Sequence, residues 1–165
     1  MDNWRWADVP VIIRTGKRLP QRLTEVIIHF QPAPHVPFGQ GQTRELTPNA
    51  LVVRVQPDDG ITLLFGAKVP GRGFDVRTVS MEFLYGRIFA NGVEDAYERL
   101  LFDALIGDPT LFIRSDEVME SWRILAPVQQ AWASGDVPLA FYPAGSWQPE
   151  EAERLLRSRR RWSEP

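Results

Sequence analysis

Four cationic side chains gather in a short stretch near the start of the chain. Arg14, Lys17, Arg18 and Arg22 follow an apolar run at residues 9–13. A lysine ammonium offers a compact point charge, and an arginine guanidinium offers a planar fork that takes two phosphate oxygens at once. Residues 14–22, named here the cationic loop, are therefore predicted to bind an anion such as a phosphate group.

A second interpretation of the cationic loop stands beside the first. Charged loops between strands are commonly only solvated, and a short motif alone carries a high risk of a false match. Pro20 restricts the backbone and lowers the entropy lost on binding, which favours a ligand site without requiring one. From the residues alone, both interpretations stay open.

Longer segments around the cationic loop form a second, collinear pattern. In chain order they are residues 2–6, 9–10, 14–19, 31–35, 53–57, 66–71, 95–100, 114–117 and 142–147. Together these segments resemble the carboxyl-terminal domain of glucose-6-phosphate dehydrogenase. The resemblance covers nearly the whole chain, so it is far more specific than any one motif within it.

The resemblance assigns substrate contacts to three residues. Lys17 and Arg22 match substrate-contacting cations of the family, facing the sugar phosphate or a nearby hydroxyl. Gln56 matches a glutamine near the substrate, and its amide both donates to and accepts from hydroxyl groups. Without the resemblance, Gln56 is an ordinary solvent-facing strand residue.

The resemblance also bears on cofactors. It implies NADP, bound mainly by an amino-terminal Rossmann domain that we expect this chain to lack. Some members hold a second, structural NADP on the carboxyl-terminal domain, and Arg14 and Arg54 match two of its cationic contacts. Leu23 and Ile27 stand where further cations are needed. The loss of two charges predicts that this second site is weakened or missing.

The implied activity is the oxidation of glucose 6-phosphate to 6-phosphogluconolactone by a cytoplasmic oxidoreductase of carbohydrate metabolism, in the oxidative pentose phosphate pathway. The chain has no Gly-x-Gly-x-x-Gly fingerprint and no match to the family's catalytic histidine segment. His29 and His35, the two histidines, are interpreted as structural. We therefore expect no catalytic residue and no metal site here, and no turnover by the chain alone.

Two alternatives of another class remain. One is a free-standing, non-catalytic module that binds a sugar phosphate or dimerises, and the other is a sheet dimer without a ligand. Trp4 and Trp6 begin the chain abruptly, and such side chains normally need something to pack against. That start favours the interpretation as part of a longer enzyme.

Composition narrows the class of protein. The 165 residues are 44% hydrophobic and 24% charged, which is typical of a globular domain with a sizeable core. The net charge of -2 disfavours a broad nucleic-acid surface, and no apolar run approaches the roughly 20 residues that span a bilayer. The chain has no cysteine, which excludes disulfides and zinc thiolate sites.

The hydrophobic pattern predicts strands followed by helices. Strands are expected at residues 9–14, 24–30, 51–56, 61–65 and 74–85, where apolar residues alternate. Helical spacing follows at residues 96–105, then in a helix capped by Ser115 that Pro127 should kink or break, then from Pro149 to about Leu156. This order predicts an α+β fold, with a large, mostly antiparallel sheet and helices packed on one face.

Apolar residues on both faces of the expected strands suggest two packing surfaces. Ile27 lies opposite Ile28, and Val52 lies opposite Val53. One face would pack on helices and the other on a second copy, so a homodimer or homotetramer formed through the sheet is expected, as the resemblance also implies.

Overall fold

The structure is a computed structural model that describes residues 3–32, 48–71, 73, 75–89 and 96–155. The chain divides into two compact units. The first joins residues 1–22 to residues 140–165, and the second spans residues 23–139. The cationic loop therefore belongs to the first unit, and the sheet belongs to the second.

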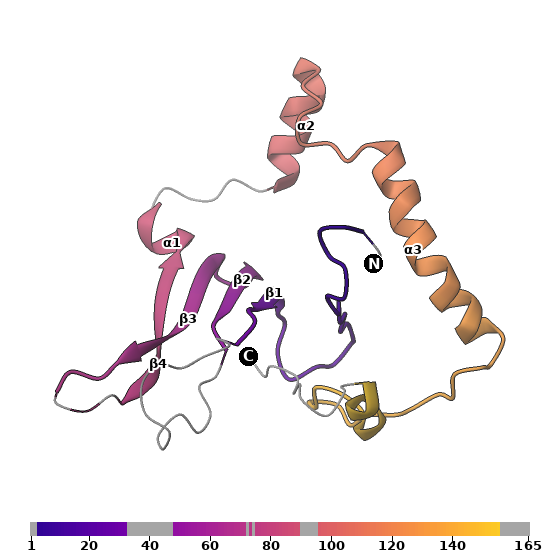
Figure 1. Cartoon of the computed structure of the whole chain (residues 1–165). Coiled ribbons are helices and arrows are strands. Elements are labelled where there is room, and N and C mark those ends of the chain that lie inside the picture. Colours follow the sequence, from indigo (N-terminus) through magenta and orange to yellow (C-terminus); the bar gives the residue numbers. More distant parts are fainter. Residues whose placement is uncertain (1–2, 33–47, 72, 74, 90–95, 156–165) are drawn as a thin grey trace. The chain divides into compact units, whose positions relative to one another are not determined.

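The second unit contains one antiparallel sheet of four strands in the order β1-β2-β3-β4. The strands are β1 (Thr24–His29), β2 (Ala50–Gln56), β3 (Gly60–Lys68) and β4 (Val76–Leu84). Figure 1 shows them side by side in sequence order. Each strand pairs only with its sequence neighbours within the described sheet, so the predicted antiparallel arrangement is confirmed.

The strand register gathers the alternating apolar residues on one face of the sheet. Val53 lies between Val26 on β1 and Ile61 on β3, and Ile61 pairs with Phe83 on β4. Directly paired residues project to the same face. A second row repeats the pattern with Ile28, Leu51, Leu63 and Met81. These two rows, named here the apolar sheet face, cross all four strands.

The opposite face of the sheet is more polar. Its cross-strand row runs from Ile27 through Val52 and Thr62 to Glu82. Glu25 pairs with Arg54 on the same side, which places opposite charges across the β1–β2 ladder. Val55 falls at an irregularity in that ladder, after which Thr24 pairs with Gln56.

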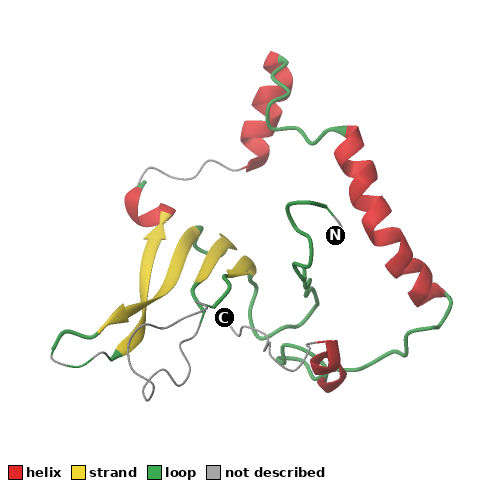
Figure 2. Ribbon diagram, viewed as in Figure 1, coloured by secondary structure: helices red, strands yellow, loops and turns green. Residues whose placement is uncertain are grey.

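Helices follow the strands, as the pattern predicts. They are α1 (Tyr85–Ile88), α2 (Ala96–Ile106), α3 (Ser115–Ala133) and the 3-10 helix η1 (Glu150–Leu155). Figure 2 colours the helices red and the strands yellow. The α+β class is thus confirmed, while the packing of helices on one face stays a prediction. No helix in the described ranges is long and apolar enough to cross a membrane.

Three local features differ from what the pattern suggested. Residues 9–14 form no strand, although their apolar run suggested one. Of the two outcomes expected at Pro127, a kink or a break, the break does not occur, because α3 is continuous from Ser115 to Ala133. The helix expected from Pro149 is instead the tighter 3-10 helix η1. In each case the pattern located a segment and misjudged its backbone geometry.

The start of α3 also differs from the prediction. Arg114, rather than Ser115, occupies the position before the first helical residue. Its backbone N–H donates to Glu117 Oε2 at 3.2 Å, and its guanidinium donates twice to the carboxylate of Asp116 at 2.9 and 2.8 Å. Glu117 therefore satisfies the backbone N–H of Arg114, and both acids lie at the positive end of the helix dipole, where negative charge is favourable.

Candidate functional site

The cationic loop has no regular secondary structure in its described form. Lys17, Arg18 and Arg22 are exposed, whereas Arg14 and Leu19 are half-buried. Arg18 adopts the left-handed region with φ of 57°. A non-glycine residue in this region is strained, and such strain persists only where the surroundings enforce it.

Residues 142–147, here the 142–147 segment, hydrogen-bond to the cationic loop across most of the sequence. The Tyr142 hydroxyl donates to the backbone carbonyl oxygen of Lys17 at 2.7 Å. The Gly145 N–H donates to the carbonyl oxygen of the next residue, Arg18, at 2.8 Å. Gly145 itself has φ of 85°, a conformation that glycine adopts at little cost. Two consecutive carbonyls of the loop are therefore fixed by one segment.

An aromatic contact adds a third point of attachment. The Arg14 guanidinium lies over the Trp147 ring, with its carbon 4.9 Å from the ring centroid. Gly16 lies close to the same segment, because a methyl group built on its Cα would be 3.0 Å from the Tyr142 hydroxyl. The 142–147 segment thus touches the loop on both sides of Lys17.

Charge at the loop is positive. None of the ion pairs between described residues involves Lys17 or Arg18; those pairs are Arg99–Asp103, Arg114–Asp116 and Arg123–Glu120. A cation without a neighbouring carboxylate remains available to an anionic ligand. The structure therefore has an exposed lysine whose backbone is fixed by hydrogen bonds from the 142–147 segment.

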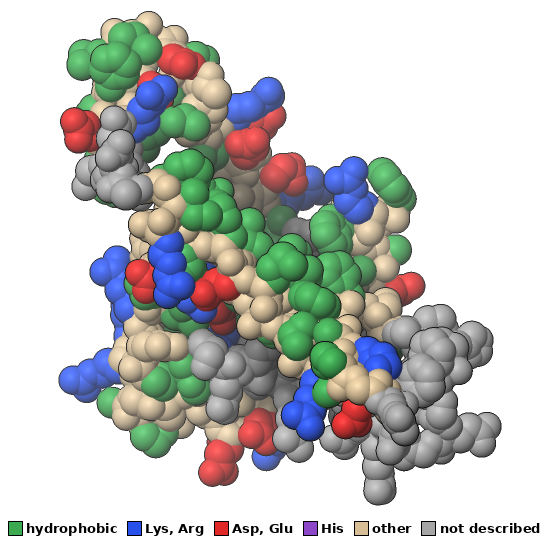
Figure 3. All heavy atoms as spheres, turned by 90° about the vertical axis from the view of Figure 1, so that its left-hand side faces the viewer, with side chains coloured by type: hydrophobic (Ala, Val, Ile, Leu, Met, Phe, Trp, Pro, Cys, Tyr) green, Lys and Arg blue, Asp and Glu red, His purple; other side chains and the backbone are tan. Residues whose placement is uncertain are grey.

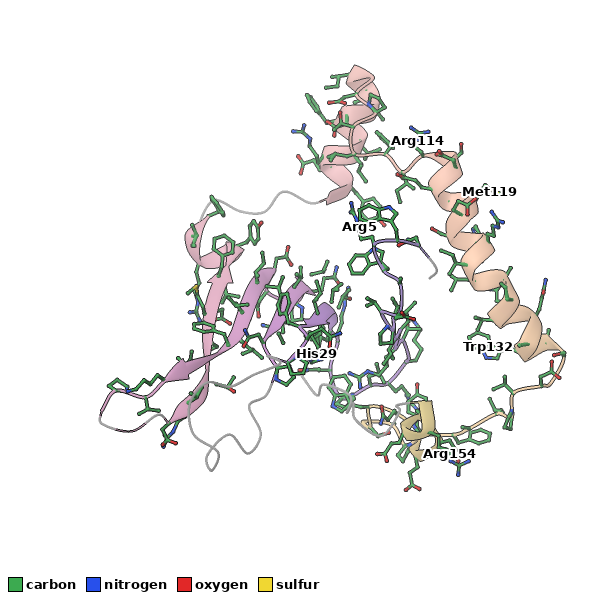
Figure 4. The ribbon with its side chains drawn as sticks, viewed as in Figure 1. Arg5, His29, Arg114, Met119, Trp132 and Arg154 are labelled. Carbon is green, nitrogen blue, oxygen red and sulfur yellow. The ribbon has the colours of Figure 1, made fainter. Side chains whose placement is uncertain are left out.

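The other predicted site residues lie in the second unit. Gln56 is exposed at the end of β2 and pairs with Thr24, which begins β1 two residues after Arg22. His29 ends β1, as Figure 4 shows, and His35 lies outside the described residues. The structure thus describes Lys17 and Arg22 in one unit and Gln56 in the other.

The described residues do not fit a dinucleotide cofactor of the Rossmann type. That fold needs parallel strands around a glycine-rich turn, whereas all strand pairs here are antiparallel. A second nucleotide site would use Arg54. Its buried Nε has no hydrogen-bond partner among the described residues. Leu23 and Ile27 are apolar and half-buried, so they add no charge beside Arg14 and Arg54.

Among the described residues, two carboxyl groups have lowered pKa values, and both lie outside the cationic loop. The hydrogen bond from the Thr110 hydroxyl lowers the pKa of Asp108. The hydrogen bonds from Arg114 lower the pKa of Asp116. Both groups organise the turn before α3 and the start of that helix, which is a structural role.

Sequence reasoning missed the role of the 142–147 segment. The segment carries part of the family resemblance, and Pro143 and Gly145 are typical of a turn, but neither feature assigns it a contact with the cationic loop. Tyr142 and Trp147 are amphipathic aromatic residues, which commonly find a polar partner when half-buried, and this was the one available signal. No local pattern says that the hydrogen-bond partner of Tyr142 lies 125 residues earlier.

Known proteins resemble this chain over its whole length. The family model described as glucose-6-phosphate dehydrogenase, C-terminal domain, matches residues 1–163. "Glucose-6-phosphate 1-dehydrogenase 2" of Mycobacterium tuberculosis (strain ATCC 25618 / H37Rv) is 50% identical over 166 residues, covering 100% of this chain and 32% of the relative. The chain thus spans about a third of the length of the curated relatives it matches.

Two solved structures share the fold. One, described as glucose-6-phosphate dehydrogenase in complex with its substrate glucose-6-phosphate, superposes with a TM-score of 0.78 at 33% identity, over 93% of this chain and 31% of that one. The glucose-6-phosphate 1-dehydrogenase from Mycobacterium avium superposes with a TM-score of 0.77 at 38% identity, over 99% of this chain and 33% of that one. This chain belongs to the family of the glucose-6-phosphate dehydrogenase carboxyl-terminal domain.

Proposed function

We propose that residues 1–165 act as the substrate-binding and oligomerisation domain of an NADP-dependent glucose-6-phosphate dehydrogenase. The reaction is the oxidation of glucose 6-phosphate to 6-phosphogluconolactone, in the oxidative pentose phosphate pathway of the cytoplasm. The observation that supports this proposal most directly is the exposed Lys17 on a backbone fixed by Tyr142. The family model matches the chain over residues 1–163.

The chain's own residues contribute binding rather than hydride transfer. The Lys17 ammonium and the Arg22 guanidinium contact the sugar phosphate or a neighbouring hydroxyl, and the Gln56 amide contacts sugar hydroxyls. NADP, held mainly by residues of a Rossmann domain, supplies the hydride acceptor when bound. Fixed cations reduce the entropy lost when the substrate is oriented, which is how a binding domain assists the reaction.

Oligomerisation is the second part of the proposal. Val26, Ile28 and Met81, on the apolar sheet face, are 54%, 39% and 62% exposed in the single chain. Figure 3 shows hydrophobic side chains at the surface in green among charged ones. An apolar face that remains partly exposed on all four strands of a sheet is typical of an interaction site. A homodimer or homotetramer covers it by pairing this face with a second copy.

The test of substrate binding exploits the two lysines of the chain, Lys17 and Lys68. Reductive ¹³C-methylation labels both ammonium groups, and Lys68→Arg assigns their resonances. Lys68 donates to the carbonyl oxygens of Val69 and Gly71, at 3.1 and 3.0 Å, and is the internal control. Glucose 6-phosphate should shift the Lys17 resonance and leave that of Lys68 in place.

Three comparisons complete this experiment. Glucose at the same concentration should shift the Lys17 resonance less, because it lacks the phosphate group. The purified chain should reduce no NADP, and measurable turnover would contradict its assignment as a non-catalytic part. A Lys17 resonance that does not shift when glucose 6-phosphate is added would favour a sheet dimer without a ligand.

A further inference from the structure

We infer that the 142–147 segment positions the cationic loop for glucose 6-phosphate, with Tyr142 as the positioning residue for Lys17. The inference rests on the proposed function, because it names how the binding lysine is held. It concerns contacts within the first unit only. Tyr142 acts through the loop backbone and is not itself assigned a substrate contact.

Arg18, next to Lys17, has a strained backbone. Its φ of 57° lies in the left-handed region, which costs a non-glycine residue on the order of 1 kcal/mol. A loop of this kind relaxes to other conformations unless something outside it prevents that. The cationic side chains would then sample many directions, and the ligand would have to order them.

The two hydrogen bonds from the 142–147 segment act directly on that strained residue. Peptide groups are planar, so each bonded carbonyl fixes a whole plane. The Lys17 carbonyl belongs to the plane before the Arg18 Cα, and the Arg18 carbonyl belongs to the plane after it. The φ and ψ of Arg18 describe how these two planes are rotated about their shared Cα. Tyr142 and Gly145 therefore hold both planes that define the strained conformation.

The same bonds set the direction of the Lys17 side chain. The Lys17 Cα is the first atom of the plane that Tyr142 anchors, so fixing that plane limits where its Cβ points. Gly16, just before it, leaves room for the hydroxyl, since an added Cβ would stand 3.0 Å from the Tyr142 oxygen and 3.3 Å from Leu19 Cδ2. Trp147 anchors the other end of the loop through Arg14. Lys17 is thus bracketed by supported residues.

The test uses a complete enzyme whose turnover can be followed. The chain is joined to the first two thirds of the Mycobacterium tuberculosis relative, which is 50% identical to it over the replaced part. Tyr142→Phe then deletes one hydroxyl. Since one neutral hydrogen bond supplies a factor of about five, KM for glucose 6-phosphate should rise about fivefold. The kcat and the KM for NADP should not change.

Two further variants separate the explanations. Tyr85→Phe makes the same chemical change on α1 and should leave all three constants unchanged. Lys17→Ala reports on the proposed function itself. If Lys17→Ala raises KM and Tyr142→Phe does not, the inference falls while the proposed function stands. If Lys17→Ala leaves KM unchanged, the proposed function falls and takes the inference with it.

A merely structural role for Tyr142 gives a different result. In that case the folded Tyr142→Phe enzyme shows a changed kcat and changes in both KM values together, and this outcome overturns the inference. Should Tyr142→Phe fail to fold, Gly16→Ala decides, because its methyl group presses on the same hydroxyl from the loop side. A selective rise in KM for glucose 6-phosphate supports the inference, and unchanged constants overturn it.

Discussion

At the scale of single residues, the close approach of Gly16 to the Tyr142 hydroxyl predicts that substitutions at these two positions affect stability in a coupled way. A methyl group at Gly16 would meet that oxygen at 3.0 Å, so one of the two must shift. Gly16→Ala should therefore lower the free energy of unfolding by about 1 kcal/mol, in the range for mild overpacking. In a Tyr142→Phe background the oxygen is gone, and the same change should cost less.

A double-mutant cycle measured by urea unfolding quantifies this coupling. The account predicts an interaction energy clearly different from zero between Gly16→Ala and Tyr142→Phe. Gly16→Ala combined with Tyr85→Phe is the matched control and should be additive. Additivity in both pairs would mean that the hydroxyl does not lie against Gly16 in solution.

Residue types predicted the cationic side chains but not their support. The sequence alone identifies the positive charges of Lys17, Arg18 and Arg22 near a glycine and a proline, because residue type determines side-chain charge. The left-handed φ of Arg18 could not be predicted from the sequence, since only glycine and, less often, asparagine or aspartate indicate that region. A hydrogen bond that spans 125 residues leaves no trace in a local pattern.

At the scale of elements, Gly60 at the start of β3 is the described glycine with the least room for a side chain. A Cβ there would lie 2.5 Å from the Phe83 carbonyl oxygen and 2.7 Å from Leu84 Cδ2. Because the first of these atoms is backbone, it cannot rotate aside. Gly60→Ala should destabilise the protein by about 1–3 kcal/mol, as overpacking does.

Guanidinium chloride unfolding measures this effect, and Gly86→Ala provides the control. Gly86 lies in α1, and an added Cβ would have nothing within 4 Å. There alanine should be neutral or stabilising by up to about 1 kcal/mol, the difference in helix propensity. Equal effects of the two substitutions would contradict the described register of β3 on β4.

The start of α3 makes stability depend on pH. The hydrogen bonds from Arg114 lower the pKa of Asp116 below its ordinary value of 3.8. A group with a depressed folded-state pKa stabilises the fold above its unfolded pKa and loses that contribution as the pH falls through the folded value. Wild type should therefore exceed Asp116→Asn in stability near neutral pH, and the gap should close below about pH 4.

Urea unfolding across a pH series measures that gap. Arg114→Gln removes the hydrogen-bonding partner, so in this background Asp116→Asn should change the pH dependence much less. A gap that stays constant from neutral to acid pH would show that the Arg114–Asp116 pair does not form in solution.

The elements themselves were largely predictable, and their details were not. Period-two alternation identified β1 to β4, and helical spacing identified α2 and α3, because each has one face more apolar than the other. The apolar run at residues 9–14 has the composition of a strand but no pairing partner among the described strands. Composition cannot supply a partner, so that strand was wrongly predicted.

At the scale of the whole molecule, the exposed apolar sheet face predicts self-association. Met81, paired with Leu63 on this face, is 62% exposed, so Met81→Glu places a charge on the proposed interface. The wild-type chain should sediment as a dimer or tetramer at micromolar concentration, and Met81→Glu as a monomer. Burying an unpaired carboxylate is strongly unfavourable, which is the physical reason.

Ser80→Glu is the control for this experiment. Ser80 neighbours Met81 on β4 but projects to the opposite face, since successive strand residues alternate. It should leave the assembly intact. A monomeric wild type, or equal effects of the two glutamates, would contradict oligomerisation through the apolar sheet face.

The measurement that bears most directly on the central claim is the KM for glucose 6-phosphate of the joined enzyme with Lys17→Ala. Losing a charge-assisted contact to the substrate should raise this KM about 10- to 100-fold, with little change in the KM for NADP. Lys68→Ala, at the other lysine, should leave both constants unchanged. A Lys17→Ala enzyme with wild-type KM would show that the cationic loop does not bind the substrate.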